Sequence, residues 1–327
     1  MLTVLSWLYG LIGWIRNRCF DLGILPSRSL PGVVISVGNI ASGGTGKSPV
    51  VVSLARRIQA SGGRPAVVTR GYRGGLRSGQ WQVVENGKVI LGNAPRAAVA
   101  DEARMQSMAL PGVPVIVGSR RWEAVQGYLA AITGPAPTHF ILDDGFQHRS
   151  IRRDLDYVLL DGRNPFGDLL PKGLFREGIA ALRRASGVVI TKSVEQRQVD
   201  EVRRRLRDAS LSLPVWEAKM SVSDPVRVCG EDFSGSVRWC AIAGIAMPGD
   251  FVASLKSRNI IAQVQFFSGD HKSFDAPKVI AARSRFDAVI TTSKDWARDE
   301  AEFRGLGCPV FVLPVEVEWT AGAPELS

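Results

Sequence analysis

The sequence predicts an α/β protein: a larger domain built on a mainly parallel sheet, a smaller C-terminal α/β domain, and an apolar helix at the N-terminus. Short runs rich in Val and Ile alternate with helical stretches, which is typical of parallel strands joined by crossover helices. The alternation breaks in a Ser- and Pro-containing stretch at residues 211–224 and then begins again. We therefore predict an N-terminal helix within residues 1–25, a larger domain over 26–220 and a smaller domain over 221–327.

The individual elements follow from β-branched runs and from turn residues. Asn86-Gly87 indicates a hairpin turn inside residues 81–91, because this pair accepts the left-handed backbone of tight hairpins. In the larger domain we expect a helix over 50–60 and strands at 33–37, 66–69, 113–117, 139–142, 157–160 and 188–191. In the smaller domain we expect helices over 250–258 and 276–284 and strands at 238–243, 262–266, 288–292 and 310–314.

Composition limits the possible partners. Of 327 residues, 45% are hydrophobic and 22% are charged, which excludes a disordered or fibrous chain. Lys and Arg number 41 against 31 Asp and Glu, a net charge of +10, and this excess favours nucleic acid, a phosphorylated substrate or an anionic membrane. The Arg clusters are scattered and lack interleaved aromatic residues, so no nucleic acid is expected. Four Cys without a CxxC pair and only three His indicate reduced thiols and no structural metal.

The first fifteen residues, MLTVLSWLYGLIGWI, are nearly all apolar and precede Arg16 and Arg18. They are too few to span a bilayer, and the charge follows the apolar run, unlike in a signal peptide. A helix would place Trp7, Leu11, Trp14 and Ile15 on one face. That face could lie in the headgroup layer, anchored by Arg16, Arg18 and Arg28, or it could pack on the core of the protein itself.

A glycine-rich loop follows the strand at 33–37 and precedes the helix. It reads ASGGTGKS over residues 41–48, close to G-x-x-x-x-G-K-[ST] with Ala41 in place of the first glycine. In such a loop backbone N–H groups surround phosphate oxygens, the Lys contacts the β- and γ-phosphates, and the Ser hydroxyl contacts Mg²⁺. We expect a nucleoside triphosphate site formed by Ala41, Ser42, Gly43, Gly44, Thr45, Gly46, Lys47 and Ser48.

Two adjacent carboxylates, Asp143 and Asp144, end the apolar strand at 139–142. Taken alone they could belong to a turn or cap a helix. Beside a phosphate loop, acidic groups at a strand end are better explained as groups that hold the metal of a bound nucleotide.

The chain resembles the tetraacyldisaccharide 4′-kinases, the lipid A 4′-kinases of Gram-negative bacteria, over most of its length. The most specific block is DDGFQH at residues 143–148, followed by RDLD at 153–156. The resemblance also includes LSWLYG at 5–10, ISVGN at 35–39, the phosphate loop, TRGY at 69–72, DE at 101–102, VGSRR at 117–121, residues 171–177, DH at 270–271 and TTSKD at 291–295.

Two departures from the family pattern concern loops. Asp101 and Glu102 lie between Ala100 and Ala103, where the family usually has Gly and Pro. The usual PxGxLRE becomes PKGLFRE at residues 171–177, with a basic Lys172 and Phe175 in place of Leu. The acids themselves are retained, so the departures affect the geometry of the loops more than the chemistry.

The resemblance implies transfer of the γ-phosphoryl group of ATP, with Mg²⁺, to the 4′-hydroxyl of tetraacyldisaccharide 1-phosphate, giving the 1,4′-bisphosphorylated lipid A precursor. It implies a phosphate-loop domain and a smaller C-terminal domain that closes a cleft. It further implies a peripheral enzyme at the cytoplasmic face of the bacterial inner membrane, on an anionic membrane surface, with no obligate protein partner.

By the same resemblance, Asp101 is the base for the acceptor hydroxyl and His271 is its partner. Taken alone, Asp101 could equally be the N-cap of a helix over residues 102–108, and His271 could be a hydrogen-bonded loop histidine. Glu102, Asp143 and Asp144, with Ser48, are assigned to Mg²⁺ and the water around it, without deciding which of them binds the ion directly. Contacts to phosphate or substrate are expected from Arg70, Tyr72, Arg121, Gln147, His148 and Arg176, although each arginine could equally form a surface ion pair.

Two other kinds of protein could use this loop. Membrane-bound ATPase switches carry a second Lys at the position of Ser42, so the sequence disfavours that class. A soluble small-molecule kinase would explain the loop but would leave the apolar N-terminus unexplained.

Overall fold

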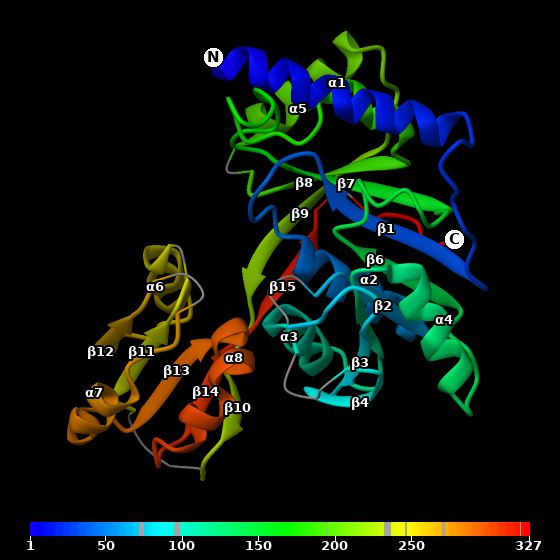
Figure 1. Ribbon diagram of the computed structural model, residues 1–327. Helices are drawn as coiled ribbons and strands as arrows, with labels where there is room; N and C mark the ends of the chain where they lie inside the picture. Colours follow the sequence, from blue (N-terminus) through cyan, green and yellow to red (C-terminus); the bar gives the residue numbers. More distant parts are fainter. Residues whose placement is uncertain are drawn as a thin grey trace. The chain divides into compact units, whose positions relative to one another are not determined.

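The computed structural model describes residues 1–71, 75–94, 99–193, 195–231, 237–245, 247–269, 272–320 and 322–327. The chain divides into two compact units, one of Met1–Met220 with Val317–Ser327 and one of Ser221–Glu316 (Figure 1). We predicted that residues 317–327 belong to the smaller domain. That boundary is wrong, because these residues belong to the first unit. Trp319 donates to the Ser53 hydroxyl at 3.0 Å, and Arg57 donates to the carbonyl of Pro324 at 2.8 Å.

The first unit carries a ten-stranded sheet in the order β15-β9-β8-β7-β1-β6-β2-β5-β3-β4. In this order, each pair of neighbouring strands between β9 and β5 is parallel. Strand β3 is antiparallel to both of its neighbours, β5 and β4. The strands are β1 (Val33–Asn39), β2 (Pro65–Thr69), β3 (Trp81–Glu85), β4 (Lys88–Gly92), β5 (Val115–Gly118), β6 (His139–Asp143), β7 (Leu155–Asp161), β8 (Gly187–Thr191), β9 (Val215–Val222) and β15 (Val315–Trp319).

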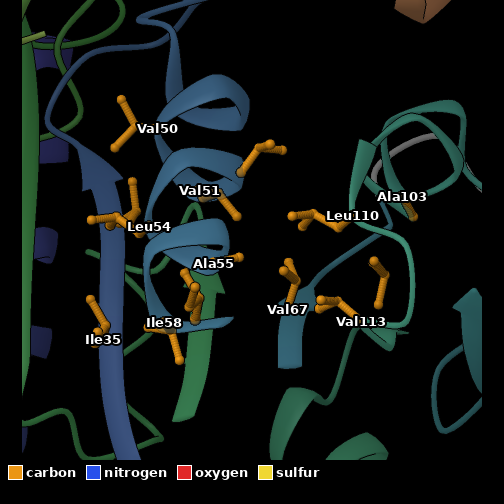
Figure 2. Close-up of a cluster of buried hydrophobic side chains, with 14 of the residues drawn as sticks. Ile35, Val50, Val51, Leu54, Ala55, Ile58, Val67, Ala103, Leu110 and Val113 are labelled. Carbon is orange, nitrogen blue, oxygen red and sulfur yellow. The ribbon is translucent and has the colours of Figure 1, made fainter. Parts of the chain in front are cut away.

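The helices of the first unit are α1 (Leu2–Asp21), α2 (Lys47–Ala60), α3 (Asp101–Ala109), α4 (Arg121–Ala131), the 3-10 helix η2 (Ile179–Arg184) and α5 (Gln196–Asp208). On α2, the residues Val50, Val51, Leu54, Ala55 and Ile58 are fully buried against Ile35, Val67, Leu110 and Val113 (Figure 2). Truncating such a side chain costs about 2–5 kcal/mol of stability. The core therefore fixes α2, and with it the N-terminal end of α2 that follows the glycine-rich loop.

The second unit has a five-stranded sheet in the order β10-β14-β13-β11-β12. Among the strand pairs described for this sheet, β10–β14 is antiparallel and the other pairs are parallel. Its elements are β10 (Val226–Cys229), β11 (Trp239–Ala243), α6 (Pro248–Ser257), β12 (Ala262–Phe267), α7 (Ala276–Ala281), the 3-10 helix η3 (Arg283–Arg285), β13 (Ala288–Thr292), α8 (Ser293–Arg304) and β14 (Val310–Leu313).

The predicted fold class is confirmed, since the strands expected from β-branched runs are present in a mainly parallel sheet. The hairpin turn is also confirmed: Asn86 and Gly87 both have positive φ, 48° and 76°, as a two-residue hairpin turn requires. The sequence analysis missed β9, which lies within the stretch that we took as a break between domains. Glu217, Lys219 and Ser221 alternate with apolar residues over this stretch, which is the pattern of a half-buried strand, but we gave more weight to the Ser and Pro residues around it.

Helix α1 is longer than its apolar segment and presents its apolar side chains to solvent. Trp7 is 77% exposed and Trp14 59% exposed, and Leu11 and Ile15 are also exposed. The side that packs on the protein is small and polar: Ser6 is buried, and Gly10 lies against Leu169. The alternative that the apolar face packs on the protein's own core is therefore wrong. Among the described residues, no helix is long and apolar enough to cross a membrane.

Candidate active site

The glycine-rich loop runs from the end of β1 to the first residue of α2. Gly43 and Gly46 have φ of 118° and 80°, a backbone region that other residues rarely adopt. A Cβ on Gly46 would lie 2.8 Å from the terminal methyl group of Met220. Gly46 is the N-cap of α2 and offers no side chain to its first turn, so the N–H groups of that turn remain available to an anion.

Hydrogen bonds from three neighbouring side chains help to hold this loop in shape. The Asn39 side chain donates to the Thr45 hydroxyl at 3.0 Å, and the Thr191 hydroxyl donates to the Thr45 carbonyl at 2.8 Å. The Lys192 ammonium donates to the carbonyl of Gly44. Sequence analysis did not single out Thr191 or Lys192. The only available signal was their place at the end of β8, because parallel strands end at the same edge of a sheet.

Lys47 and Arg176 both contact Asp144. The Lys47 ammonium lies 3.4 Å from one carboxylate oxygen, and the Arg176 guanidinium lies 3.0 Å from the other. Burial by itself would raise the pKa of Asp144, but Lys47, Arg176 and Arg121 outweigh it and hold the pKa below the usual value. Asp144 is therefore ionised between two cations that could also bind phosphate oxygens.

Asp143 and Glu102 form an acidic pair beside the loop. Glu102 accepts a hydrogen bond from Ser48 at 2.9 Å, and the buried Asp143 accepts one from Gln106 at 2.6 Å. Glu102 and Gln106 are four residues apart on α3, so they lie on one face of that helix. Burial, with the charge of Glu102, raises the pKa of Asp143 to about 6. Gln106 was missed, although its spacing from Glu102 was visible in the sequence.

These oxygens fit a magnesium site of the kind that nucleotides complete. Within the described parts of the chain, no three His, Cys, Asp or Glu side chains converge closely enough to hold a metal ion by themselves. Mg²⁺ is usually bound by one or two carboxylates together with phosphate oxygens and water. Ser48, Glu102 and Asp143 supply hard oxygen donors, and the repulsion between the two carboxylates would be relieved by a cation.

Arg121 is buried, so the surface ion pair considered for it is wrong. Its guanidinium donates to the backbone carbonyl of Asp144 at 3.1 Å. Burial lowers the pKa of Arg121 to about 10, which leaves it charged at neutral pH. Its Nε atom is buried and has no hydrogen-bond partner among the described residues.

Gln147 and His148 order the loop that follows β6. Gln147 donates to the Asn39 carbonyl and to Glu177, both at 2.9 Å. The His148 ring lies 2.9 Å from the Ser150 hydroxyl. Burial, followed by the charges of Arg121 and Arg153, lowers the pKa of His148 to about 3. His148 is therefore neutral at physiological pH.

Asp101 is the first residue of α3, and Ala100 is the N-cap. The alternative that Asp101 caps this helix is therefore wrong. Arg70 is exposed directly after β2. Tyr72 and His271 lie outside the described residues, and the roles assigned to them stay predictions.

The second unit's TTSKD segment joins β13 to α8. The Thr292 hydroxyl accepts a hydrogen bond from the Asp295 backbone N–H at 3.1 Å, and Asp295 forms a buried ion pair with Arg298 at 2.8 Å. The structure thus gives Thr292 and Asp295 a role in starting a helix.

Comparison with known proteins agrees with this geometry. A family profile described as tetraacyldisaccharide-1-P 4′-kinase matches residues 1–326. The chain belongs to this family. It is 34% identical over 336 aligned positions to the tetraacyldisaccharide 4′-kinase of Chlorobium luteolum, covering 98% of this chain and 93% of that protein. The enzyme of the same name from Chlorobaculum tepidum is 35% identical, with the same coverage.

A solved structure is also similar. The "apo" form of LpxK from Aquifex aeolicus, described as a complex with ATP, superposes with a TM-score of 0.74 at 27% identity, covering 98% of this chain and 94% of that one. The family predicted from the sequence is thereby confirmed. The chain is an ATP-dependent kinase of lipid A biosynthesis that acts on a lipid disaccharide.

Proposed function

We propose that this kinase transfers the γ-phosphoryl group of ATP to the 4′-hydroxyl of tetraacyldisaccharide 1-phosphate, at the site formed by the glycine-rich loop, the start of α3 and the end of β6. One observation carries the assignment to these residues: Lys47 and Arg176 both contact Asp144 beside the anion-binding start of α2. Phosphoryl transfer depends mainly on positioning and on neutralising charge, and this cluster supplies cations on a rigid support.

The roles follow from the contacts. The N–H groups at the start of α2 and the Lys47 ammonium bind the phosphates of ATP. Asp144 orients Lys47 and Arg176, so that both cations are in place before the transferring group accumulates charge. Ser48, Glu102 and Asp143 would hold Mg²⁺. The bound ion would neutralise charge on the phosphates.

The acceptor hydroxyl needs a base within hydrogen-bond reach. We assign that role to Asp101, whose carboxylate is not used to cap α3. His271 is its proposed partner and, by the family resemblance, comes from the smaller domain. An imidazole paired with a carboxylate would fix its orientation and accept the proton that it carries away.

Helix α1 supports a peripheral membrane location. Its exposed apolar residues include two tryptophans, which favour the interface between headgroups and acyl chains. Arg18 is exposed on the same helix. Arg28 stacks on the Trp122 ring at 4.4 Å, and Arg16 donates to the Gln147 carbonyl, so these two are less available to lipid. We propose that the enzyme rests on an anionic membrane surface, at the cytoplasmic face of the inner membrane, where its lipid substrate is held.

The test is an assay with labelled ATP and purified tetraacyldisaccharide 1-phosphate, scored for a bisphosphorylated lipid. Production of that lipid, dependent on Mg²⁺, is the expected result. If membranes stimulate ATP hydrolysis and no phosphorylated lipid forms, the chain would be an ATPase switch and the proposal would be wrong.

A further inference from the structure

A segment of the first unit, residues 168–177, lies between helix α1 and the glycine-rich loop and hydrogen-bonds to both. We call it the bridging segment. On one side the Ser6 hydroxyl of α1 donates to the Leu169 carbonyl at 2.9 Å and accepts from the Lys172 N–H at 3.0 Å. Gly10 packs so closely on Leu169 that an added Cβ would lie 2.8 Å from its side chain.

On its other side, the bridging segment pairs with the loop. The Arg176 N–H donates to the Ile40 carbonyl at 2.7 Å, and the Ser42 N–H donates to the Leu174 carbonyl at 2.7 Å. Ala41 and Phe175 form an antiparallel bridge between these two contacts. The position of the loop and the position of Arg176 are therefore set by the same short segment.

Asn17 of α1 closes the connection at the far end of this segment. Its amide donates to one oxygen of the Glu177 carboxylate at 2.9 Å. The other Glu177 oxygen accepts from Gln147 at 2.9 Å, and Gln147 also donates to the Asn39 carbonyl at the end of β1. A chain of hydrogen bonds thus runs from α1 to Asn39, the last residue of β1, which lies just before the glycine-rich loop.

We propose that Asn17, assisted by Ser6, is a positioning residue: it holds the glycine-rich loop and Arg176 in place through the bridging segment. Helix α1 then has a second role besides the membrane contact, since its polar face supports the phosphate site while its apolar face is exposed. The inference rests on the proposed function only in using lipid phosphorylation as one of its readouts.

The effect should be on turnover more than on binding of the lipid. Arg184 also holds Glu177, with contacts of 2.7 and 2.8 Å, so the loss of Asn17 alone loosens the segment without releasing it. We expect Asn17→Ala to lower kcat roughly fivefold, and Ser6→Ala with Asn17→Ala to lower it roughly 20-fold, because hydrogen bonds to charged groups are among the stronger ones. Asn17→Asp should be worse than Asn17→Ala, since it places a second carboxylate against Glu177.

The experiment measures kcat and both KM values with the lipid in detergent micelles, so that vesicle binding is not required. Asn164→Ala, the same change at an exposed asparagine of the first unit, is the matched control and should behave as the unchanged protein. Hydrogen exchange, measured on each variant, should show faster exchange of the amides at Ser42 and Arg176 with no change in strand β7.

Normal kcat with normal protection of the amides at Ser42 and Arg176 would overturn the inference. A raised KM for lipid, lost vesicle binding and unchanged kcat would also overturn it, because α1 would then serve the membrane alone. Faster exchange throughout the first unit would reduce Asn17 to a residue of general stability. If the unchanged protein forms no bisphosphorylated lipid, the proposed function fails, and the exchange experiment still decides the role of Asn17.

Discussion

The Lys47 ammonium lies 3.4 Å from the Asp144 carboxylate, although the two residues follow different strands. Lys47 is reached through the loop after β1, and Asp144 directly follows β6. The two strands are parallel neighbours, with Val37 of β1 aligned on Asp143 of β6, so their carboxyl ends meet at one edge of the sheet. Parallel pairing therefore brings the cation of the phosphate loop to Asp144 at the end of β6.

Replacing Lys47 should abolish phosphoryl transfer and leave the fold intact. Losing a cation aimed at the transferring group should reduce kcat on the order of 100-fold or more. Lys47→Ala would be compared with Lys88→Ala, which alters an exposed lysine of β4. Near-normal turnover by a folded Lys47→Ala variant would show that this loop does not hold the reacting phosphates.

The proposed pair of Asp101 and His271 predicts non-additive effects. Asp101→Ala should lower kcat by about 10²–10⁴-fold, the usual contribution of a general base. His271→Ala should also lower it strongly, and the double variant should be little worse than the worse single one, because residues that act as a unit do not add. Steady-state kinetics on the three variants tests this. Effects that multiply would mean that the residues act separately.

Placing charge on the exposed face of α1 should release the protein from membranes. Trp7→Glu with Trp14→Glu should weaken binding to vesicles of anionic lipid roughly tenfold or more, because two apolar side chains lose their place in the interface. Flotation with liposomes measures this. Ile90→Glu, at an exposed apolar residue of β4, is the control and should float normally. Unchanged flotation of the tryptophan variant would refute membrane contact through this face.

His148 should make the protein less stable as the pH falls below neutral. The pKa of His148 is lowered to about 3 in the folded protein, against about 6.5 in an unfolded chain. Between these values the unfolded chain binds the proton more readily, so stability present at pH 7 is lost as the pH falls. At pH 5 the loss is about 2 kcal/mol.

His148→Gln removes this titration. The variant should lose about 2 kcal/mol less stability than the unchanged protein between pH 7 and pH 5. Urea denaturation at both pH values measures the difference. Parallel pH profiles for the two proteins would mean that His148 is protonated in the fold as easily as in water.

Local patterns predicted most of the fold. The β-branched runs at residues 33–37 and 139–142 and the Asn86-Gly87 turn specify their structure through near neighbours, and each was found as expected. Strand β9 and the return of residues 317–327 to the first unit were missed. Residues 215–222 carry the apolar–polar alternation of a strand, but the Ser and Pro residues around them led us to interpret the stretch as a break between domains. The return of residues 317–327 depends on contacts with distant residues such as Ser53, which no local pattern predicts.

The fold class, the family and the residue types of the phosphate site could all be predicted from the sequence, because glycines, a lysine and paired carboxylates at fixed spacing are chemical requirements that are visible in the residues themselves. The folded protein was needed to show which of these groups lie in contact. Gln106 lies against Asp143. Asp144 lies between Lys47 and Arg176. The fold also turned the polar face of α1 toward residues 168–177 and left the tryptophans exposed. Hydrogen bonds and ion pairs depend on distances of about 3 Å, and for residues far apart in the chain these distances are set by strand pairing and core packing.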